Sequence, residues 1–253
     1  MVDIHSHIVY GVDDGAKTLE NSVAMLEMAA QCGTTDIVAT PHSDNKYQYD
    51  AELITARIAE MQAAMGDRIR IHKGCDFHLH FDNIRRCEED RSRFTINGKR
   101  YLMVEFADAH IPKNIDYVFQ DMLRRDITPV ITHPERNNLL MGRVNEMIEW
   151  VRFGCLVQVT AQSFTGRFGK KAEEGARRLM RQNMVHFVAS DAHDTEWRPP
   201  DLREARLLVS TEYGESTAVR LFETHPRMTL TGEYIECDDP EDPEEPKPWY
   251  KFW

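Results

Sequence analysis

The sequence predicts one α/β domain in which parallel strands and helices alternate around a barrel. Short apolar runs of strand length recur along most of the 253 residues, and helical stretches separate them. Roughly seven strand–helix units follow one another without a change in composition, which favours one domain over two. Many of the apolar runs end in histidine, aspartate or glutamate. This pattern is typical of barrels whose active site lies at the carboxyl ends of the strands.

The first part of the chain contains regular strand–helix units. Val2 and Ile4 mark a first strand that ends at His5. Thr18 is a suitable N-cap for the following helix and Gly33 a suitable end, while Asp50 can cap the next helix. We expect strands over 2–5 and 35–40, a third strand from residue 69 toward residue 76, helices over 19–31 and 51–65, and a charged, solvated helix near 82–92.

A local break in this alternation is expected around Asn97-Gly98, which is the strongest short turn signal for a β-hairpin. Apolar stretches flank it over 94–96 and 100–106. The sequence therefore predicts a hairpin inserted into the barrel.

The remaining elements restore the alternation. Pro112 favours the start of a helix, because its fixed φ suits the first helical turn. We expect helices over 113–125, 143–153, 170–183, 201–213 and 215–224, with strands over 129–132, 156–160 and 185–189. We assign the domain to residues 1–235.

The last stretch, residues 236–253, differs in composition. Residues 236–248 hold seven acidic residues and one lysine, together with several prolines. Such a segment lacks the apolar residues needed for a core, so we expect an acidic, Pro-rich, disordered tail.

Composition limits the classes of function. The formal net charge is −11, which does not suit nucleic-acid binding, since that needs a basic face. Five scattered cysteines without a C-x-x-C motif indicate reduced thiols rather than a disulfide framework. No signal peptide pattern and no apolar run of transmembrane length occur. We therefore expect a cytoplasmic protein without a transmembrane segment.

Nine side chains suited to divalent metals lie at or near the expected strand ends. Imidazole nitrogens and carboxylate oxygens bind such metals, and nine exceed the needs of one ion. Two or three ions bridged by carboxylates would fit, with a shared water activated as a metal-bridging hydroxide for in-line displacement. The nine residues are His5, His7, Asp14, His42, Asp76, Glu105, His133, Asp191 and His193.

Two arginines accompany these residues. Arg136 follows His133, and Arg198 lies five residues after His193. Guanidinium groups pair with phosphate oxygens in a bidentate way, so the combination favours phosphoester hydrolysis over peptide or amide cleavage.

Other candidates are weaker. Cys87 and Arg93 have the C-x5-R spacing of cysteine-dependent tyrosine phosphatases, but three carboxylates between them would repel phosphate and disfavour a thiolate. His78 and His80 share a strand face with Asp76 and are candidates for substrate contact. Phe164, Phe168 and Trp197 are candidates for stacking on a substrate ring, although core packing would also explain them.

Five short motifs contain most of these residues. They are His5-Ser-His7 with Asp13-Asp14-Gly15, Thr40-Pro-His42, Val104-Glu-Phe106, Thr132-His-Pro-Glu-Arg136, and Ala189-Ser-Asp-Ala-His193 with Arg198-Pro-Pro200. In this order, over about residues 1–230, they resemble the PHP superfamily, named for polymerase and histidinol phosphatase. More closely, they look like its bacterial protein-tyrosine phosphatases, which are encoded with capsule and exopolysaccharide functions.

The resemblance implies a distorted, TIM-like (β/α)7 barrel and three divalent ions. Manganese is the expected metal, with iron, zinc or magnesium as alternatives. The implied reaction is hydrolysis of protein phosphotyrosine, and the implied partner is a bacterial tyrosine kinase.

The resemblance also implies a grouping of the ligands. One metal would be held by His5, His7, Asp76 and Asp191, its neighbour by Glu105 and His133, and the third by Asp14, His42 and His193. Arg136 and Arg198 match the phosphate-binding arginines. Asp76 departs from the family pattern, because relatives usually carry glutamate at that position, and its shorter side chain puts this ligand in doubt.

Two alternatives stay open at the level of sequence. One is a small-molecule phosphatase of the same superfamily that acts on histidinol phosphate or a nucleotide. The other is a catalytically silent metal-binding barrel that regulates a polysaccharide export complex.

Overall fold

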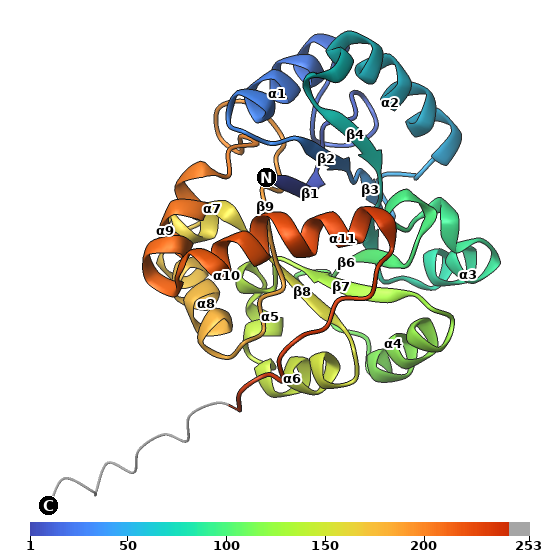
Figure 1. The fold of residues 1–253 in the computed structure, drawn as a ribbon. Coiled ribbons are helices and arrows are strands. Elements are labelled where there is room, and N and C mark those ends of the chain that lie inside the picture. The colour runs from blue at the N-terminus through green and yellow to red at the C-terminus, as the bar shows by residue number, and fades with distance from the viewer. Residues whose placement is uncertain (243–253) are drawn as a thin grey trace, which may run out of the picture.

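Helices surround a ring of parallel strands in the computed structural model, which describes residues 1–242 (Figure 1). The strands form a three-stranded sheet of order β1-β2-β4 and a six-stranded sheet of order β3-β5-β6-β7-β8-β9. All strand pairs within residues 1–242 are parallel. The strands are β1 Val2–Ser6, β2 Asp36–Ala39, β3 His42–Ser43, β4 Arg70–Lys73, β5 Asp76–His78, β6 Tyr101–Glu105, β7 Thr128–Thr132, β8 Leu156–Thr160 and β9 Phe187–Ala189.

The two sheets meet where the chain runs from β2 into β3 and from β4 into β5. Pro41 interrupts the first of these lines, because proline has no N–H for the ladder. Gly74 interrupts the second, where a Cβ would lie 2.8 Å from Val38 Cγ1. At the opposite seam, an isolated parallel bridge pairs Ser6 with Ala192, and His7 N donates to Ala192 O at 2.8 Å. The strands therefore follow one another around the ring in chain order.

The helices lie on the outside of the strands, and their predicted caps are confirmed. Thr18 accepts a hydrogen bond from Asn21 N, and Asp50 accepts from Glu52 N and Leu53 N. The α-helices are α1 Leu19–Gln31, α2 Ala51–Met65, α3 Phe81–Glu89, α4 Ile115–Arg124, α5 Asn138–Met141, α6 Val144–Arg152, α7 Ala161–Phe164, α8 Lys170–Arg181, α9 Arg203–Tyr213, α10 Glu215–Val219 and α11 His225–Thr231, with a π-helical turn, η5 Arg220–Thr224, between the last two.

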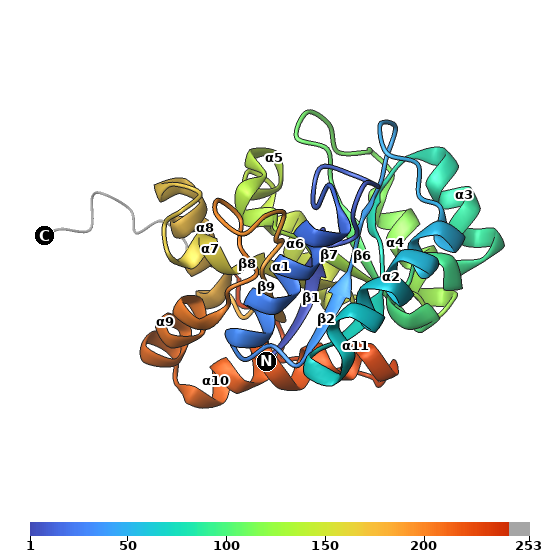
Figure 2. The ribbon, with the colours of Figure 1, turned by 90° about the horizontal axis from the view of Figure 1, so that it is seen from above.

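The inside of the ring is apolar at one end and polar at the other. Met103 on β6 and Ala189 on β9 pack in one core cluster, which α11 covers with Met228 and Leu230. Figure 2 shows α11 at the end of the molecule where the N-terminus lies. Glu105 lies two residues after Met103 on the same face of β6, because side chains alternate along a strand, and Asp191 lies two residues beyond the end of β9. The carboxylates of Glu105 and Asp191 therefore lie at the end of the ring opposite α11.

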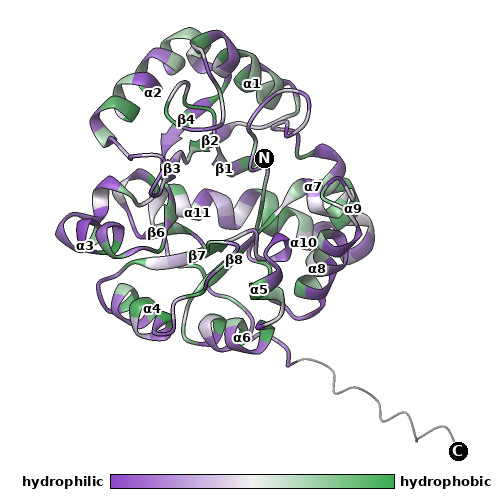
Figure 3. Cartoon of the chain, turned by 180° about the vertical axis from the view of Figure 1, so that it is seen from behind, coloured by the Kyte–Doolittle hydropathy of each residue, from purple (hydrophilic) through white to green (hydrophobic). Residues whose placement is uncertain are grey.

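Colouring by hydropathy shows where the helices carry hydrophilic and hydrophobic residues (Figure 3). The surface helices carry hydrophilic residues alternating with hydrophobic ones, as expected for helices packed on one side only. α4, for example, buries Ile115, Phe119 and Met122. None of the described helices has both the length and the apolar character needed to cross a membrane.

The predicted hairpin around Asn97-Gly98 is wrong. Asn97 and Gly98 do turn the chain with positive φ of 51° and 67°, but within a 3-10 turn, η3 Ile96–Gly98. Phe94 is not in a strand; it is buried against Tyr49 and Phe77, with ring centroids 5.3 Å away in both cases. β6 pairs in parallel with β5 and β7 instead. Tertiary packing therefore overrides the local turn signal.

The beginning of the predicted tail contacts the body. Arg220 Nη1 donates to Asp238 Oδ2 at 3.3 Å, Glu241 N donates to Gln182 O at 2.9 Å, and Arg152 Nη2 donates to Asp242 Oδ1 at 2.7 Å. Residues 236–242 therefore lie against the barrel. The expectation of disorder for residues 243–253 lies outside the described residues.

Candidate metal centre

The nine predicted ligands converge at the polar end of the ring. Each has a nitrogen or oxygen atom within 3.6 Å of such an atom on another member of the set. Seven lie at strand ends or in the loops that follow them, and His42 and Asp76 are the first residues of β3 and β5, which continue the lines of β2 and β4. This placement explains why residues from 5 to 193 meet in one place.

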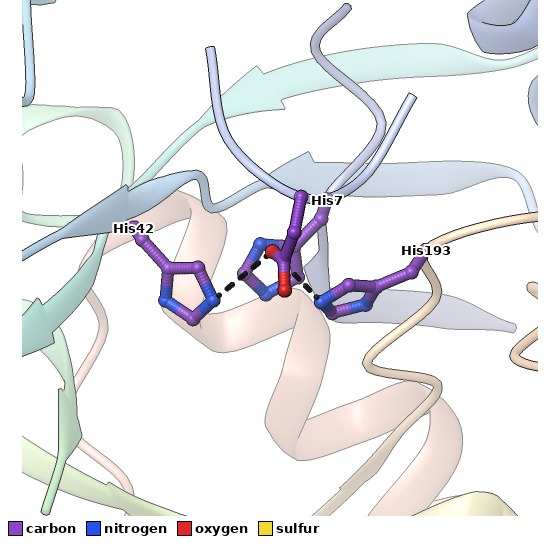
Figure 4. A group of neighbouring side chains, drawn as sticks. His7, His42 and His193 are labelled. Carbon is purple, nitrogen blue, oxygen red and sulfur yellow. Dashed lines mark ion pairs between the residues drawn. The ribbon is translucent and has the colours of Figure 1, made fainter. Parts of the chain in front are cut away.

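Asp14 lies between two imidazoles on one side of the cluster. Its Oδ1 is 3.4 Å from both His42 Nε2 and His193 Nε2. Figure 4 shows His42 and His193 on either side of His7. Donor atoms of these four residues all lie within 4.8 Å of one another, which is close enough to surround one cation.

Asp76 and Asp191 occupy the centre of the cluster. Asp76 Oδ2 is 3.2 Å from His42 Nδ1 and 3.6 Å from His5 Nε2. Asp191 Oδ1 is 3.6 Å from His5 Nε2 and 3.4 Å from His7 Nε2. Each carboxylate thus faces two imidazoles, an arrangement suited to bridging neighbouring ions.

Glu105 and His133 form the third part. Glu105 Oε1 is 3.5 Å from His133 Nε2, and Glu105 Oε2 is 3.3 Å from His42 Nδ1. His133 has a left-handed backbone with φ of 33°, which is unusual for a residue with a side chain. Strained backbone of this kind is common at functional sites.

Several buried polar atoms of the cluster have no hydrogen-bond partner. They include Nε2 of His5 and of His7, and both carboxylate oxygens of Asp76. A buried polar group without a partner is costly, and a carboxylate more so. Because these atoms point at one another and combine imidazole with carboxylate, divalent cations fit the donor set.

A second layer of residues orients the imidazoles. His7 Nδ1 lies 2.8 Å from Asp13 Oδ2, and His5 Nδ1 lies 2.9 Å from Gln158 Oε1. Both contacts leave Nε2 directed into the cluster, as outer partners of metal-binding histidines do. A Cβ on Gly15 would lie 1.9 Å from His7 O, so only glycine lets this loop pack there.

Asp13 and Gln158 were not predicted as site residues. A polar glutamine within the apolar strand β8 was the available signal for Gln158, because buried polar side chains need partners. Asp13 had the weaker signal of standing beside Asp14.

The electrostatics of the cluster are dominated by its carboxylates. Burial opposes a charge on His5, yet Asp191 and Asp76 raise the pKa of His5 to about 9. Hydrogen bonds from His193 and His42 lower the pKa of Asp14. Burial lowers the pKa of His133 to about 4, which keeps it in the neutral form that binds metals. The cluster is therefore set to attract positive charge.

Arg136 and Arg198 lie together beside the cluster. Arg136 Nη1 and Arg198 Nη2 both contact Asp191 Oδ2. Their guanidinium carbons lie 4.3 and 6.0 Å from the ring centroid of Phe168. The two forks are thus held at the edge of the centre, where they can bind an anion.

The structure places the weaker candidates from the sequence in different surroundings. His78 contacts Glu105, whereas His80 is the N-cap residue of α3. Phe164 is buried in the core, and Trp197 is 67% exposed. The Cys87 thiol is buried, and burial raises its pKa to about 12, which is the opposite of what a cysteine nucleophile requires.

Comparison with known proteins identifies the family. The family model described as "Capsular polysaccharide synthesis, CpsB/CapC" matches residues 1–231. The chain belongs to this family. Tyrosine-protein phosphatase YwqE of Bacillus subtilis is 32% identical over 228 residues, covering 88% of this chain and 89% of the relative. Tyrosine-protein phosphatase CpsB of Streptococcus pneumoniae is 31% identical over 244 residues, covering 93% and 100%.

Solved structures agree with this family membership. A structure from work on YwqE of Bacillus subtilis and CpsB of Streptococcus pneumoniae, described there as unique metal-dependent tyrosine phosphatases, superposes with a TM-score of 0.91 at 27% identity. It covers 97% of this chain and 100% of its own. A lactonase from Listeria monocytogenes, covering 92% of this chain and 95% of its own, matches with a TM-score of 0.62 at 13% identity and shares the fold alone. The predicted family and barrel-like α/β fold are confirmed.

Proposed function

We propose that this chain is a metal-dependent protein-tyrosine phosphatase. The observation that carries the proposal is the convergence of nine imidazole and carboxylate ligands with two arginines, in a family whose named relatives are tyrosine phosphatases. A metal centre beside guanidinium groups suits phosphoester hydrolysis.

The proposed ligands are the nine residues of the cluster, in the three groups that the family resemblance implies. Asp76 and Asp191, which each face two imidazoles, would be shared between neighbouring ions, and Asp13 and Gln158 hold His7 and His5 in the tautomer that directs Nε2 inward. Three ions are proposed, with manganese as the first choice and iron, zinc or magnesium as alternatives. When bound, the ions would supply a water activated at neutral pH and positive charge beside the phosphoryl group.

Arg136 and Arg198 bind the phosphoryl oxygens in this proposal. Both contact Asp191 from the side of Phe168, so their N–H groups are already gathered at one point. Charge develops on the phosphoryl oxygens in the transition state, and pre-positioned donors stabilise it without reorganisation.

The proposed substrate is phosphotyrosine on a protein, with a bacterial tyrosine kinase as the partner. Trp197 directly precedes Arg198 in the chain, is 67% exposed and lies with its ring centroid 5.8 Å from the guanidinium carbon of Arg167, so we propose that it offers an apolar surface to a substrate peptide. We place the activity in the cytoplasm, because all five cysteines are free thiols. We also propose a role in capsule or exopolysaccharide regulation, which the family's description, capsular polysaccharide synthesis, supports.

The test is phosphate release from a phosphotyrosine peptide and from histidinol phosphate, after chelation and again after addition of manganese. We expect no activity after chelation and restored activity that favours the peptide. Preference for histidinol phosphate would transfer the chain to the small-molecule branch. Metal binding without either activity would support a regulatory barrel instead.

A further inference from the structure

His78 supplies a nitrogen at the edge of the metal centre that the nine-residue set does not use. It is the last residue of β5, two positions after Asp76, so both side chains lie on one face of the strand. In the ladder His78 is paired with Glu105 on β6. The strand register therefore places the imidazole of His78 beside the carboxylate of Glu105 in the metal centre.

The side chains of His78 and Glu105 are in direct contact. His78 Nε2 contacts Glu105 Oε2 within ion-pair distance, yet Glu105 Oε2 is a buried atom without a hydrogen-bond partner. A cation bound by both atoms would satisfy each of them.

Asp44 adds a second oxygen next to His78. Its Oδ1 accepts hydrogen bonds from Lys46 N at 2.7 Å and Tyr47 N at 2.5 Å, which leaves Oδ2 to lie 4.0 Å from His78 Nε2. Donor atoms of His42, Asp44 and His78 lie within 4.8 Å of one another.

The backbone of His78 is held in place by a buried side chain. Asn83 Nδ2 donates to His78 O at 3.0 Å and to Ser43 O at 2.6 Å, which ties β5 to β3. A ligand needs this kind of fixed support to keep its geometry.

We propose that His78 is a further metal ligand, which binds through Nε2 the same divalent cation as Glu105, with Asp44 as the adjacent outer carboxylate. The inference rests on the proposed metal-dependent function. An added imidazole favours ions such as manganese, iron, cobalt or zinc over magnesium. The alternative hypothesis is that His78 and Glu105 form an ion pair that does not take part in metal binding.

The first test measures metal binding without substrate. Purified full-length protein is stripped, titrated with Co²⁺ or Mn²⁺ against a chelating indicator, and compared with His78→Ala and the matched control His80→Ala. We expect His78→Ala to bind at least one ion about tenfold or more weakly, and His80→Ala to bind as the wild type does. Unchanged affinity in His78→Ala would overturn the proposal.

The second test is spectroscopic and separates a ligand from a structural residue. A thiolate bound to Co²⁺ gives a charge-transfer absorption in the near ultraviolet that imidazole ligands lack. We expect this band in cobalt-loaded His78→Cys and not in His80→Cys or the wild type, and its absence from His78→Cys would overturn the proposal. A wild type that binds no cobalt would instead overturn the proposed function itself, so the two failures are distinguishable.

Discussion

Buried histidines occur at both ends of the strand ring, and their surroundings differ. His5 lies at the polar end, where its Nε2 is 3.6 Å from both Asp76 and Asp191. His186 immediately precedes β9, at the end covered by α11, and its Nδ1 accepts a hydrogen bond from Val157 N at 3.0 Å. Both side chains are buried.

The same burial gives the two residues opposite charge preferences. Burial, together with His225 and Arg220, lowers the pKa of His186 to about 3. This imidazole therefore stays neutral, and its Nδ1 accepts the hydrogen bond from Val157 N. Against burial, the carboxylates of Asp191 and Asp76 raise the pKa of His5 to about 9. The carboxylates, rather than burial, therefore distinguish the proposed metal centre from a structural histidine.

The largest expected effect comes from replacing His133, a proposed metal ligand at the polar end of the strand ring. His133→Ala should lower kcat for phosphotyrosine hydrolysis by more than about 100-fold, because even the loss of an outer partner of a metal ligand costs about 10–100-fold. Steady-state kinetics with manganese present measures this, with His186→Gln as the control that keeps wild-type activity. Asp76→Glu should retain activity. Equal rates for His133→Ala and the wild type would remove the assignment of this site.

A smaller effect is expected from the arginines. Arg136→Lys and Arg198→Lys should each lower kcat/KM by about tenfold to 100-fold, because lysine keeps the charge but loses the bidentate fork. Metal content should not change, and elemental analysis of the purified variants measures it. Arg167→Lys, at the rim near Trp197, is the matched control. If Arg167→Lys lost as much activity as the two variants, general charge at the rim would explain the data better.

The third prediction concerns residues that contact the proposed metal ligands from outside the cluster. Asp13→Asn should weaken metal binding by about 10–100-fold, because His7 Nδ1 and His42 N both contact Asp13 Oδ2. Asp3→Asn is the control: Asp3 is buried on the same strand as His5 but accepts from Ser190 N at 3.0 Å. Titration with Mn²⁺ measures both. The outer-partner role of Asp13 is wrong if the two variants bind alike.

The smallest effect is a pH dependence of opposite sign at the two ends. In metal-free protein the pKa of His186 is lowered from 6.5 to about 3, so the unfolded chain takes up the proton first and stability falls as pH drops from 6.5 toward 3. The pKa of His5 is raised to about 9, so its contribution is complete below pH 6.5 and lost as pH rises toward 9.

Denaturant unfolding of metal-free protein at several pH values tests both signs. The free energy of unfolding of His186→Gln relative to wild type should vary only in the acid window, and that of His5→Gln only in the alkaline one. A difference for His5→Gln confined to acid pH would contradict the role given to its carboxylate neighbours.

Much of the fold and site was predictable because both depend on strand periodicity. Met103 and Glu105 share a face of β6, Asp191 follows the end of β9, and parallel strands bring their carboxyl ends together. Ligand-type residues at successive strand ends must then meet. The helix caps at Thr18 and Asp50 were equally local, and the structure contains both.

The rest depended on contacts between distant segments. Asn97-Gly98 turns the chain as predicted, but β6 pairs with β5 and β7, which the turn alone does not encode. Gln158 is 153 residues from His5, so no local pattern connects them. Likewise His78 was considered only for substrate contact, because its distance from Glu105 follows from the ladder register.

Anomalous diffraction at the manganese absorption edge, from crystals of the manganese-loaded protein, tests the central claim most directly. We expect manganese peaks within the cluster, at coordination distance from His7, Glu105 and Asp191. Loaded crystals with no peak in the cluster, or with manganese bound only elsewhere, would contradict it.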